Sequence, residues 1–80
     1  MVTVRCFARV REVLGQDTLP FPLAPDQRVT AREVLAAVAQ DRLLDLPQPL
    51  LVAVNRTHAS WDSLVQDGDE VAFFPPVSGG

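Results

Sequence analysis

The sequence predicts an α+β domain in which one main helix packs on a mostly antiparallel β-sheet. Alternating apolar and polar residues near both ends of the chain predict strands, and an apolar stripe at helical spacing in the middle predicts a helix. With 80 residues, of which 48% are hydrophobic, the chain supports one domain with a small core.

The first strand is predicted by strict alternation from residue 2 onward. One set of side chains is apolar and should face the core: Val2, Val4, Cys6 and Ala8. Phe7 falls in the other set and should point outward. Cys6 is the only cysteine, which excludes an internal disulfide, and its position indicates a buried small hydrophobe rather than a redox or catalytic group.

Two short elements should precede the main helix. Residues 11–14 can form one helical turn that ends at Gly15. Residues 18–23 are extended, and Pro20 and Pro22 within them cannot donate ladder hydrogen bonds. This second strand is therefore expected at an edge of the sheet.

The main helix has a clear start signal. Thr30 and Glu33 have the spacing of a capping box. An apolar stripe for the core follows at helical spacing, made of Ala31, Val34, Leu35 and Val38. The helix should run to about Gln40, and Pro47 and Pro49 prevent any continuation.

The second half of the chain reads as strands and turns. Residues 50–55 are a β-branched strand, residues 55–58 a turn, and residues 59–61 a short strand with Trp61 half-buried. A turn at residues 67–69 leads into the last strand, residues 70–74.

If the first and last strands pair in parallel under the helix, the arrangement is a β-grasp, although periodicity alone leaves ferredoxin-like and other small α+β folds open. In the last strand Val71 and Phe73 should face the core. Phe74 should then point outward like Phe7 and form an apolar patch with it. The competing interpretation places Phe74 in the core.

Charge and composition exclude several functions. The net charge of −3 argues against nucleic-acid binding. No apolar run is long enough to span a membrane and no export signal is visible, so we expect a cytoplasmic protein without a membrane partner. One cysteine and one histidine, His58 beside a turn, predict no metal site. All seven basic residues are arginine, so no side-chain amine is present.

The last two residues are Gly79 and Gly80. Glycine is the costliest residue to order and adds nothing to a core, so a terminal pair suits a thin arm that carries its carboxylate into another protein's active site. A plain small-residue terminus is the competing interpretation. We therefore divide the chain into a β-grasp domain, residues 1–76, and a C-terminal tail, residues 77–80.

The chain resembles the MoaD/ThiS family of ubiquitin-like sulfur carriers, and in particular the small subunit of molybdopterin synthase. The resemblance is strongest in residues 51–55, in residues 67–80 with the ending Phe-Phe-Pro-Pro-Val-Ser-Gly-Gly, and in residues 7–12. The stretch 43–50 departs from the family and is expected to change only a loop.

The resemblance implies a reaction cycle centred on Gly80. An E1-like adenylyltransferase activates its carboxylate with ATP, a sulfurtransferase supplies sulfur, and the resulting thiocarboxylate donates sulfur to cyclic pyranopterin monophosphate. The chain itself would bind no cofactor and would be the non-catalytic subunit of a heterotetrameric synthase. Gly79 would let the backbone pass a narrow channel in the large subunit. The interface would comprise Phe7, Phe74, Pro75, Pro76, Val77 and Ser78.

The residues alone leave three other functions possible. The chain could carry sulfur for thiamine thiazole or for tRNA thiolation. It could be a ubiquitin-like modifier that forms isopeptide bonds. It could be a plain interaction domain, for which removal of the two terminal glycines would change nothing.

Overall fold

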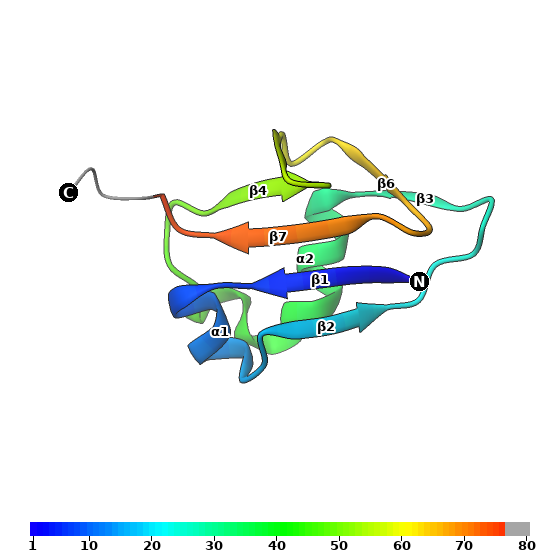
Figure 1. Ribbon diagram of the computed structural model, residues 1–80. Coiled ribbons are helices and arrows are strands. Elements are labelled where there is room, and N and C mark those ends of the chain that lie inside the picture. The colour runs from blue at the N-terminus through cyan, green and yellow to red at the C-terminus, as the bar shows by residue number, and fades with distance from the viewer. Residues whose placement is uncertain (77–80) are drawn as a thin grey trace.

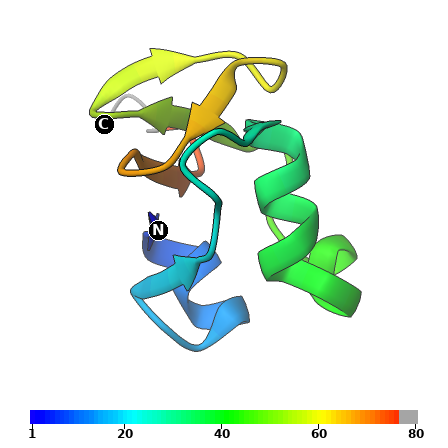
Figure 2. The same ribbon diagram turned by 90° about the vertical axis from the view of Figure 1, so that its right-hand side faces the viewer.

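The computed structural model describes residues 1–76. Five strands form one sheet in the order β2-β1-β7-β4-β5, two further strands form a second sheet, and helix α2 packs on one face of the larger sheet (Figures 1 and 2). The elements in chain order are β1 (Val2–Cys6), α1 (Ala8–Leu14), β2 (Thr18–Phe21), β3 (Arg28–Thr30), α2 (Ala31–Ala39), the 3₁₀ helix η1 (Gln40–Asp45), β4 (Leu51–Val54), β5 (Thr57–Ala59), β6 (Leu64–Gln66) and β7 (Glu70–Phe74).

The central pair of strands establishes the predicted β-grasp fold. β1 and β7 are parallel, with Val4 opposite Val71 and Cys6 opposite Phe73, whereas all other strand pairs of both sheets are antiparallel. The parallel pairing puts the start of β1 and the end of β7 at opposite ends of the sheet (Figure 1). The Met1 ammonium pairs with the Asp67 carboxylate in the turn before β7.

The core lies between this sheet and α2. Its largest fully buried side chain is Phe73, and the Trp61 ring lies almost parallel to it, at 5.8 Å between ring centroids and 8° between planes. Trp61 is half-buried, as predicted. The core also contains Val2, Val4, Cys6, Val10, Val34, Val52, Val65 and Val71.

Helix α2 begins at the predicted cap. The Glu33 backbone N–H donates to Thr30 Oγ1 at 3.2 Å, and the Thr30 hydroxyl donates to Glu33 Oε1 at 3.1 Å. The carboxylate thus binds the hydroxyl instead of the Thr30 backbone N–H that a capping box uses. The helix ends at Ala39, close to the predicted Gln40.

Three sequence predictions were wrong in detail. Ala8 does not continue the buried face of β1, because the chain leaves the sheet after Cys6 and Ala8 starts α1 as an exposed residue with φ 52°. Helix α1 is therefore longer than the predicted turn, although it ends as predicted at Gly15, whose φ is 79°. Strand β5 begins at Thr57 because Asn55 and Arg56, both with positive φ, complete a tight hairpin.

Two strands and one helix were missed. β3 and β6 pair only with each other, and each has three residues, too few to show a period. The stretch 43–50 is not a simple loop, since it starts inside η1 and places Leu46 and Leu50 in the core. β2 is an edge strand, as its prolines predicted.

Candidate functional site

Strand β7 divides its side chains between the core and the outer face of the sheet. Val71 and Phe73 are fully buried, while Ala72 and Phe74 belong to the opposite face and are half-buried. The predicted strand register is therefore correct, and the interpretation that placed Phe74 in the core is wrong. Phe74 is nevertheless partly covered: the His58 ring meets it edge-on, with centroids 5.7 Å apart and planes at 71°.

Phe7 lies at the same end of the sheet as Phe74. It follows β1 directly with extended backbone, caps the start of α1, and is 43% exposed. Cys6 is opposite Phe73 in the parallel pair of β1 and β7. Phe7 is the residue after Cys6 and Phe74 is the residue after Phe73, so the two phenylalanines are at matching positions. The Arg5 guanidinium lies 5.5 Å from the centre of the Phe7 ring.

These two rings belong to a larger apolar surface. The outward side chains of β7 and β4 lie on the same face of the sheet. The two strands pair in the register Leu51–Phe74 and Ala53–Ala72. We call this set the outer-face patch: Phe7, Leu51, Ala53, Ala72 and Phe74. Ala53 lies on this face but is only 9% exposed. Its sequence signal was incomplete, because the contribution of β4 depends on a pairing between distant segments.

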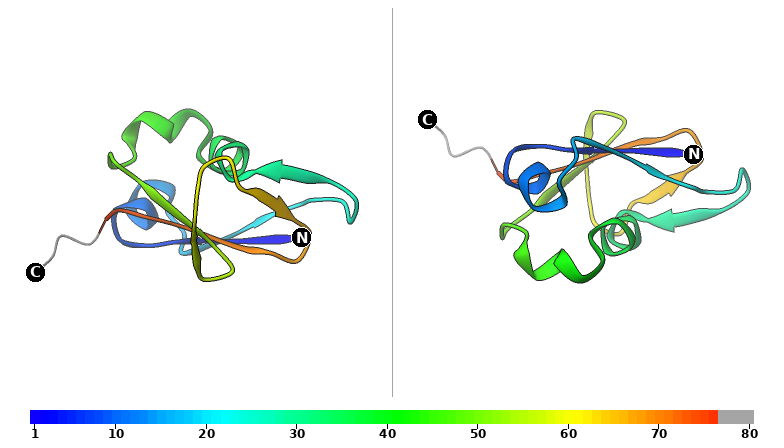
Figure 3. Two further views of the ribbon diagram at one scale, coloured as in Figure 1. Left: turned by 90° about the horizontal axis from the view of Figure 1, so that it is seen from above. Right: turned by 90° about the horizontal axis from the view of Figure 1, so that it is seen from below.

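Charged groups border the patch at the start of β7. Glu70 Oε2 lies 3.6 Å from Arg5 Nη1, and Glu70 Oε1 lies 3.5 Å from Arg56 Nε. Glu70 is opposite Thr3 in the sheet, four residues before Phe74 along β7. Glu70 therefore lies toward the Met1 end of the outer face, whereas Arg5 is opposite Ala72 and extends over the Phe7 ring. The views from above and below also show the start of β1 and the end of β7 at opposite ends of the sheet (Figure 3).

Pro75 and Pro76 continue directly from β7. Pro75 is half-buried and Pro76 is exposed. The remaining predicted site residues, Val77, Ser78, Gly79 and Gly80, lie outside the described residues. The described part of the chain thus holds the proposed interface up to Pro76.

Cys6 and His58, the two side chains that could act as a nucleophile or a base, lie on opposite faces of the sheet. Cys6 faces the core with 2% of its surface exposed, and burial, with a smaller contribution from the Asp17 carboxylate, raises the pKa of its thiol. His58 lies on the outer face. The thiol is therefore neutral and shielded, and the two do not form a Cys–His pair. Within residues 1–76, no group of three histidine, cysteine or acidic side chains converges to hold a metal ion.

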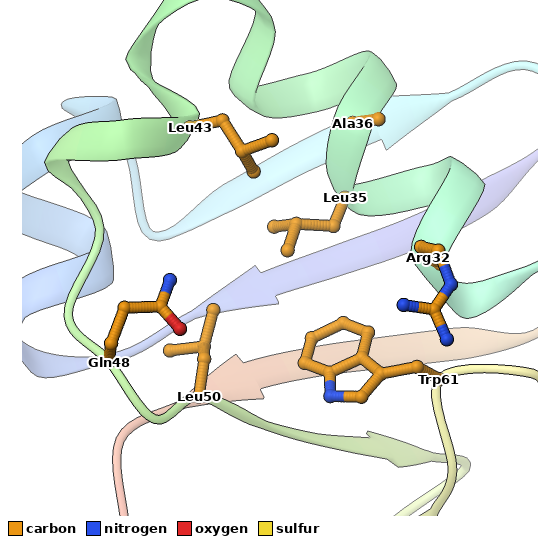
Figure 4. A pocket seen from close by; sticks show the side chains of 7 residues that line it. All are labelled: Arg32, Leu35, Ala36, Leu43, Gln48, Leu50 and Trp61. Atoms are coloured by element: carbon orange, nitrogen blue, oxygen red, sulfur yellow. The ribbon is translucent and has the colours of Figure 1, made fainter.

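A separate groove lies on the helix side of the sheet. It has a volume of about 370 Å³ and is lined by Arg32, Leu35, Ala36, Leu43, Gln48, Leu50 and Trp61 (Figure 4). The leucines point into it from α2, η1 and the segment before β4, and the indole points into it from the segment between β5 and β6. Arg32 lies at its edge, where it pairs with Asp62 at 3.1 Å. The lining contains no carboxylate or imidazole, so it offers no acid–base pair.

The described residues contain no helix that is long and apolar enough to cross a membrane. The fold is that of a β-grasp, ubiquitin-like protein, because the first and last strands, β1 and β7, are a parallel pair in the centre of the sheet and α2 covers one face. The apolar patch and the proline pair lie where β7 ends. Residues 4–80 match the ThiS family, and the chain belongs to that family.

Similar proteins agree with this assignment over the whole chain. The molybdopterin synthase sulfur carrier subunits of Escherichia coli and Haemophilus influenzae are each 43% identical to it, and the match covers 100% of both chains in each case. In structure, small archaeal modifier protein 1 of Haloferax volcanii matches with a TM-score of 0.77 at 27% identity, covering 95% of this chain and 97% of that protein.

Proposed function

We propose that this protein is the sulfur carrier subunit of a molybdopterin synthase and works in the cytoplasm. The observation that carries the proposal is end-to-end identity of 43% to two sulfur carrier subunits of that synthase. The outer-face patch beside the end of β7 supports it, because a carrier needs a docking surface next to the residues that it delivers.

The chemistry starts from the Gly80 carboxylate. A free α-carboxylate is ionised at neutral pH and is a poor electrophile. In the proposed cycle a carboxylate oxygen attacks the α-phosphorus of ATP bound to an E1-like partner, pyrophosphate leaves, and an acyl-adenylate forms. Sulfide-level sulfur supplied through a sulfurtransferase then attacks the acyl carbon, AMP leaves, and a thiocarboxylate remains. This thiocarboxylate donates its sulfur to cyclic pyranopterin monophosphate.

Catalytic groups for these steps would come from the partners. Cys6 is buried behind the sheet, and the helix-side groove has no acid or base in its lining. Gly80 is thus the carrier of a reactive atom and not a catalyst. The chain would hold no cofactor of its own, and ATP would bind the activating enzyme.

The large subunit would bind the outer-face patch together with Pro75 and Pro76. Fully covering a phenylalanine ring contributes about 1.5–3 kcal/mol, so covering the exposed parts of Phe7 and Phe74 would contribute a fraction of that to docking for each ring. In this proposal two carriers and two large subunits form a heterotetramer.

The test is the intact mass of the protein after incubation with the activating enzyme, ATP and a sulfur donor. We expect an exchange of one oxygen for sulfur at the terminus. Deletion of Gly80, or addition of one residue after it, should abolish the exchange and leave the unfolding midpoint unchanged. Sulfuration of the pterin by the extended chain would contradict the proposal.

A protein modifier is the second candidate, favoured by the structural match to a small archaeal modifier protein. It predicts conjugates of higher mass that depend on Gly80 and ATP. Such conjugates in place of a thiocarboxylate would favour this function. Copurification of a thiazole or tRNA-thiolation enzyme instead of the large subunit would indicate another sulfur pathway.

A further inference from the structure

His58 is placed where an edge strand meets the outer-face patch. It is the middle residue of β5, opposite Ala53 of β4, which is in turn opposite Ala72 of β7. Its ring contacts the Phe74 ring edge-on at 5.7 Å and is otherwise exposed. A partner that covers Phe74 therefore lies close to this imidazole.

Within the described residues, no carboxylate belongs to the outer-face patch beside His58, and the one fixed charge among its side chains is Arg5, which is opposite Ala72 and has its guanidinium 5.5 Å from the centre of the Phe7 ring. The outward neighbours across β4 and β7 are Ala53, Ala72 and Phe74. The charged groups on this face are Glu70 of β7, Arg56 of the β4–β5 turn and Arg5 of β1, and Glu70 pairs with both arginines. An imidazolium at His58 would therefore have no free carboxylate beside it among the described residues of this face, since Glu70 already pairs with Arg5 and Arg56.

We propose that His58 extends the docking surface of the large subunit and makes docking depend on pH, because the partner accepts the neutral imidazole and rejects the imidazolium. The proposal rests on the proposed function, which supplies the partner. The surface then fits an apolar partner face that places no carboxylate opposite His58.

The direction of the effect follows from desolvation. Imidazole groups change charge between about pH 5 and pH 8. Burying a charged group without a partner is far costlier than burying the neutral ring. Acidification therefore shifts free carrier into a form that docks poorly, and affinity should fall as the pH falls.

The experiment is a titration of the full-length carrier with the purified large subunit at pH 8 and at pH 5.5. For the natural carrier we expect affinity to fall by more than about twofold from pH 8 to pH 5.5, because only the neutral ring is accepted. His58→Leu keeps an apolar contact with Phe74 and cannot titrate. The affinity of this variant should change by no more than about twofold between the two pH values, after correction for the pH dependence that the partner gives to both carriers.

Two controls separate the possible results. His58→Gln, which is polar but uncharged, should show the same flat profile as His58→Leu. Both variants should stay folded with at most a small drop in the unfolding midpoint, because His58 is exposed and each variant loses only the edge-on ring contact with Phe74. Equal pH profiles for all three carriers, or tighter binding of the natural carrier at pH 5.5, would overturn the inference. Failure of every carrier to bind the large subunit at either pH would instead refute the proposed partner.

Discussion

Adjacent phenylalanines of β7 should respond in opposite ways to truncation. Phe73 is fully buried and stacks on Trp61 at 5.8 Å, so Phe73→Ala leaves a cavity in the core. Such truncations cost about 3–5 kcal/mol, a large part of the roughly 5–15 kcal/mol that stabilises a domain. We expect the thermal midpoint to fall by about 12 °C or more.

Phe74→Ala removes a side chain from the outer face. In the free protein it loses one edge-on contact with His58, a type of pair worth about 0.5–1.5 kcal/mol, and part of the burial of one ring. We expect a stability loss of no more than about 2 kcal/mol. Against the large subunit only the remaining half of the ring is covered, so affinity should fall by about 0.75–1.5 kcal/mol, or roughly 4- to 13-fold.

The assay pairs urea unfolding of each variant with titration of the large subunit. Phe73→Leu is the matched control, since it keeps most of the buried volume and should lose less stability than Phe73→Ala. Phe7→Ala tests the other ring of the outer-face patch and should behave like Phe74→Ala. If the variants at positions 73 and 74 exchanged their effects, the strand register would be off by one residue and the interface argument would fail with it.

Three further predictions follow from single residues. Burial, and to a smaller extent the Asp17 carboxylate, raises the pKa of the Cys6 thiol above the ordinary value of 9.0 in the folded state. The unfolded chain therefore loses this proton at a lower pH than the folded chain does, so the free energy of unfolding should decline as the pH rises above 9.0. Unfolding titrations at several pH values should show this decline for the natural protein and not for Cys6→Ala. Arg56→Gly relieves a positive φ of 67° and gives up only an exposed ion pair, so it should raise the free energy of unfolding by about 1 kcal/mol; a loss would contradict this account of the turn. Gly79→Val should block sulfur transfer without changing the unfolding midpoint, and a large drop in that midpoint would show that residue 79 contributes to the fold.

Much of the fold could be predicted because its signals are local. The alternation in residues 2–6 and 70–74 identifies both central strands, and the side-chain period of two decides which phenylalanine is buried. The Thr30 cap and the Gly15 stop are also local, since each acts through backbone groups within one helical turn.

What was missed depends on contacts between distant segments. β3 and β6 are three-residue strands that exist only because they pair with each other. The alternation extends through Ala8, but the chain turns after Phe7, and the cap of α1 has no side-chain hydrogen bond that would have marked the turn. His58 belongs to the candidate site through β5 pairing and its contact with Phe74, and neither is visible in a residue beside a turn.

The parallel pairing of β1 and β7 connects the fold to the proposed function. The two strands run side by side and end together, so Phe7 and Phe74 emerge at the end of the sheet where Pro75 and Pro76 begin (Figure 1). An antiparallel pair would have put Phe7 at the other end of the sheet. The same register that buries Cys6 and Phe73 therefore also places the two rings of the proposed interface next to Pro75 and Pro76, ahead of the segment that a carrier would deliver.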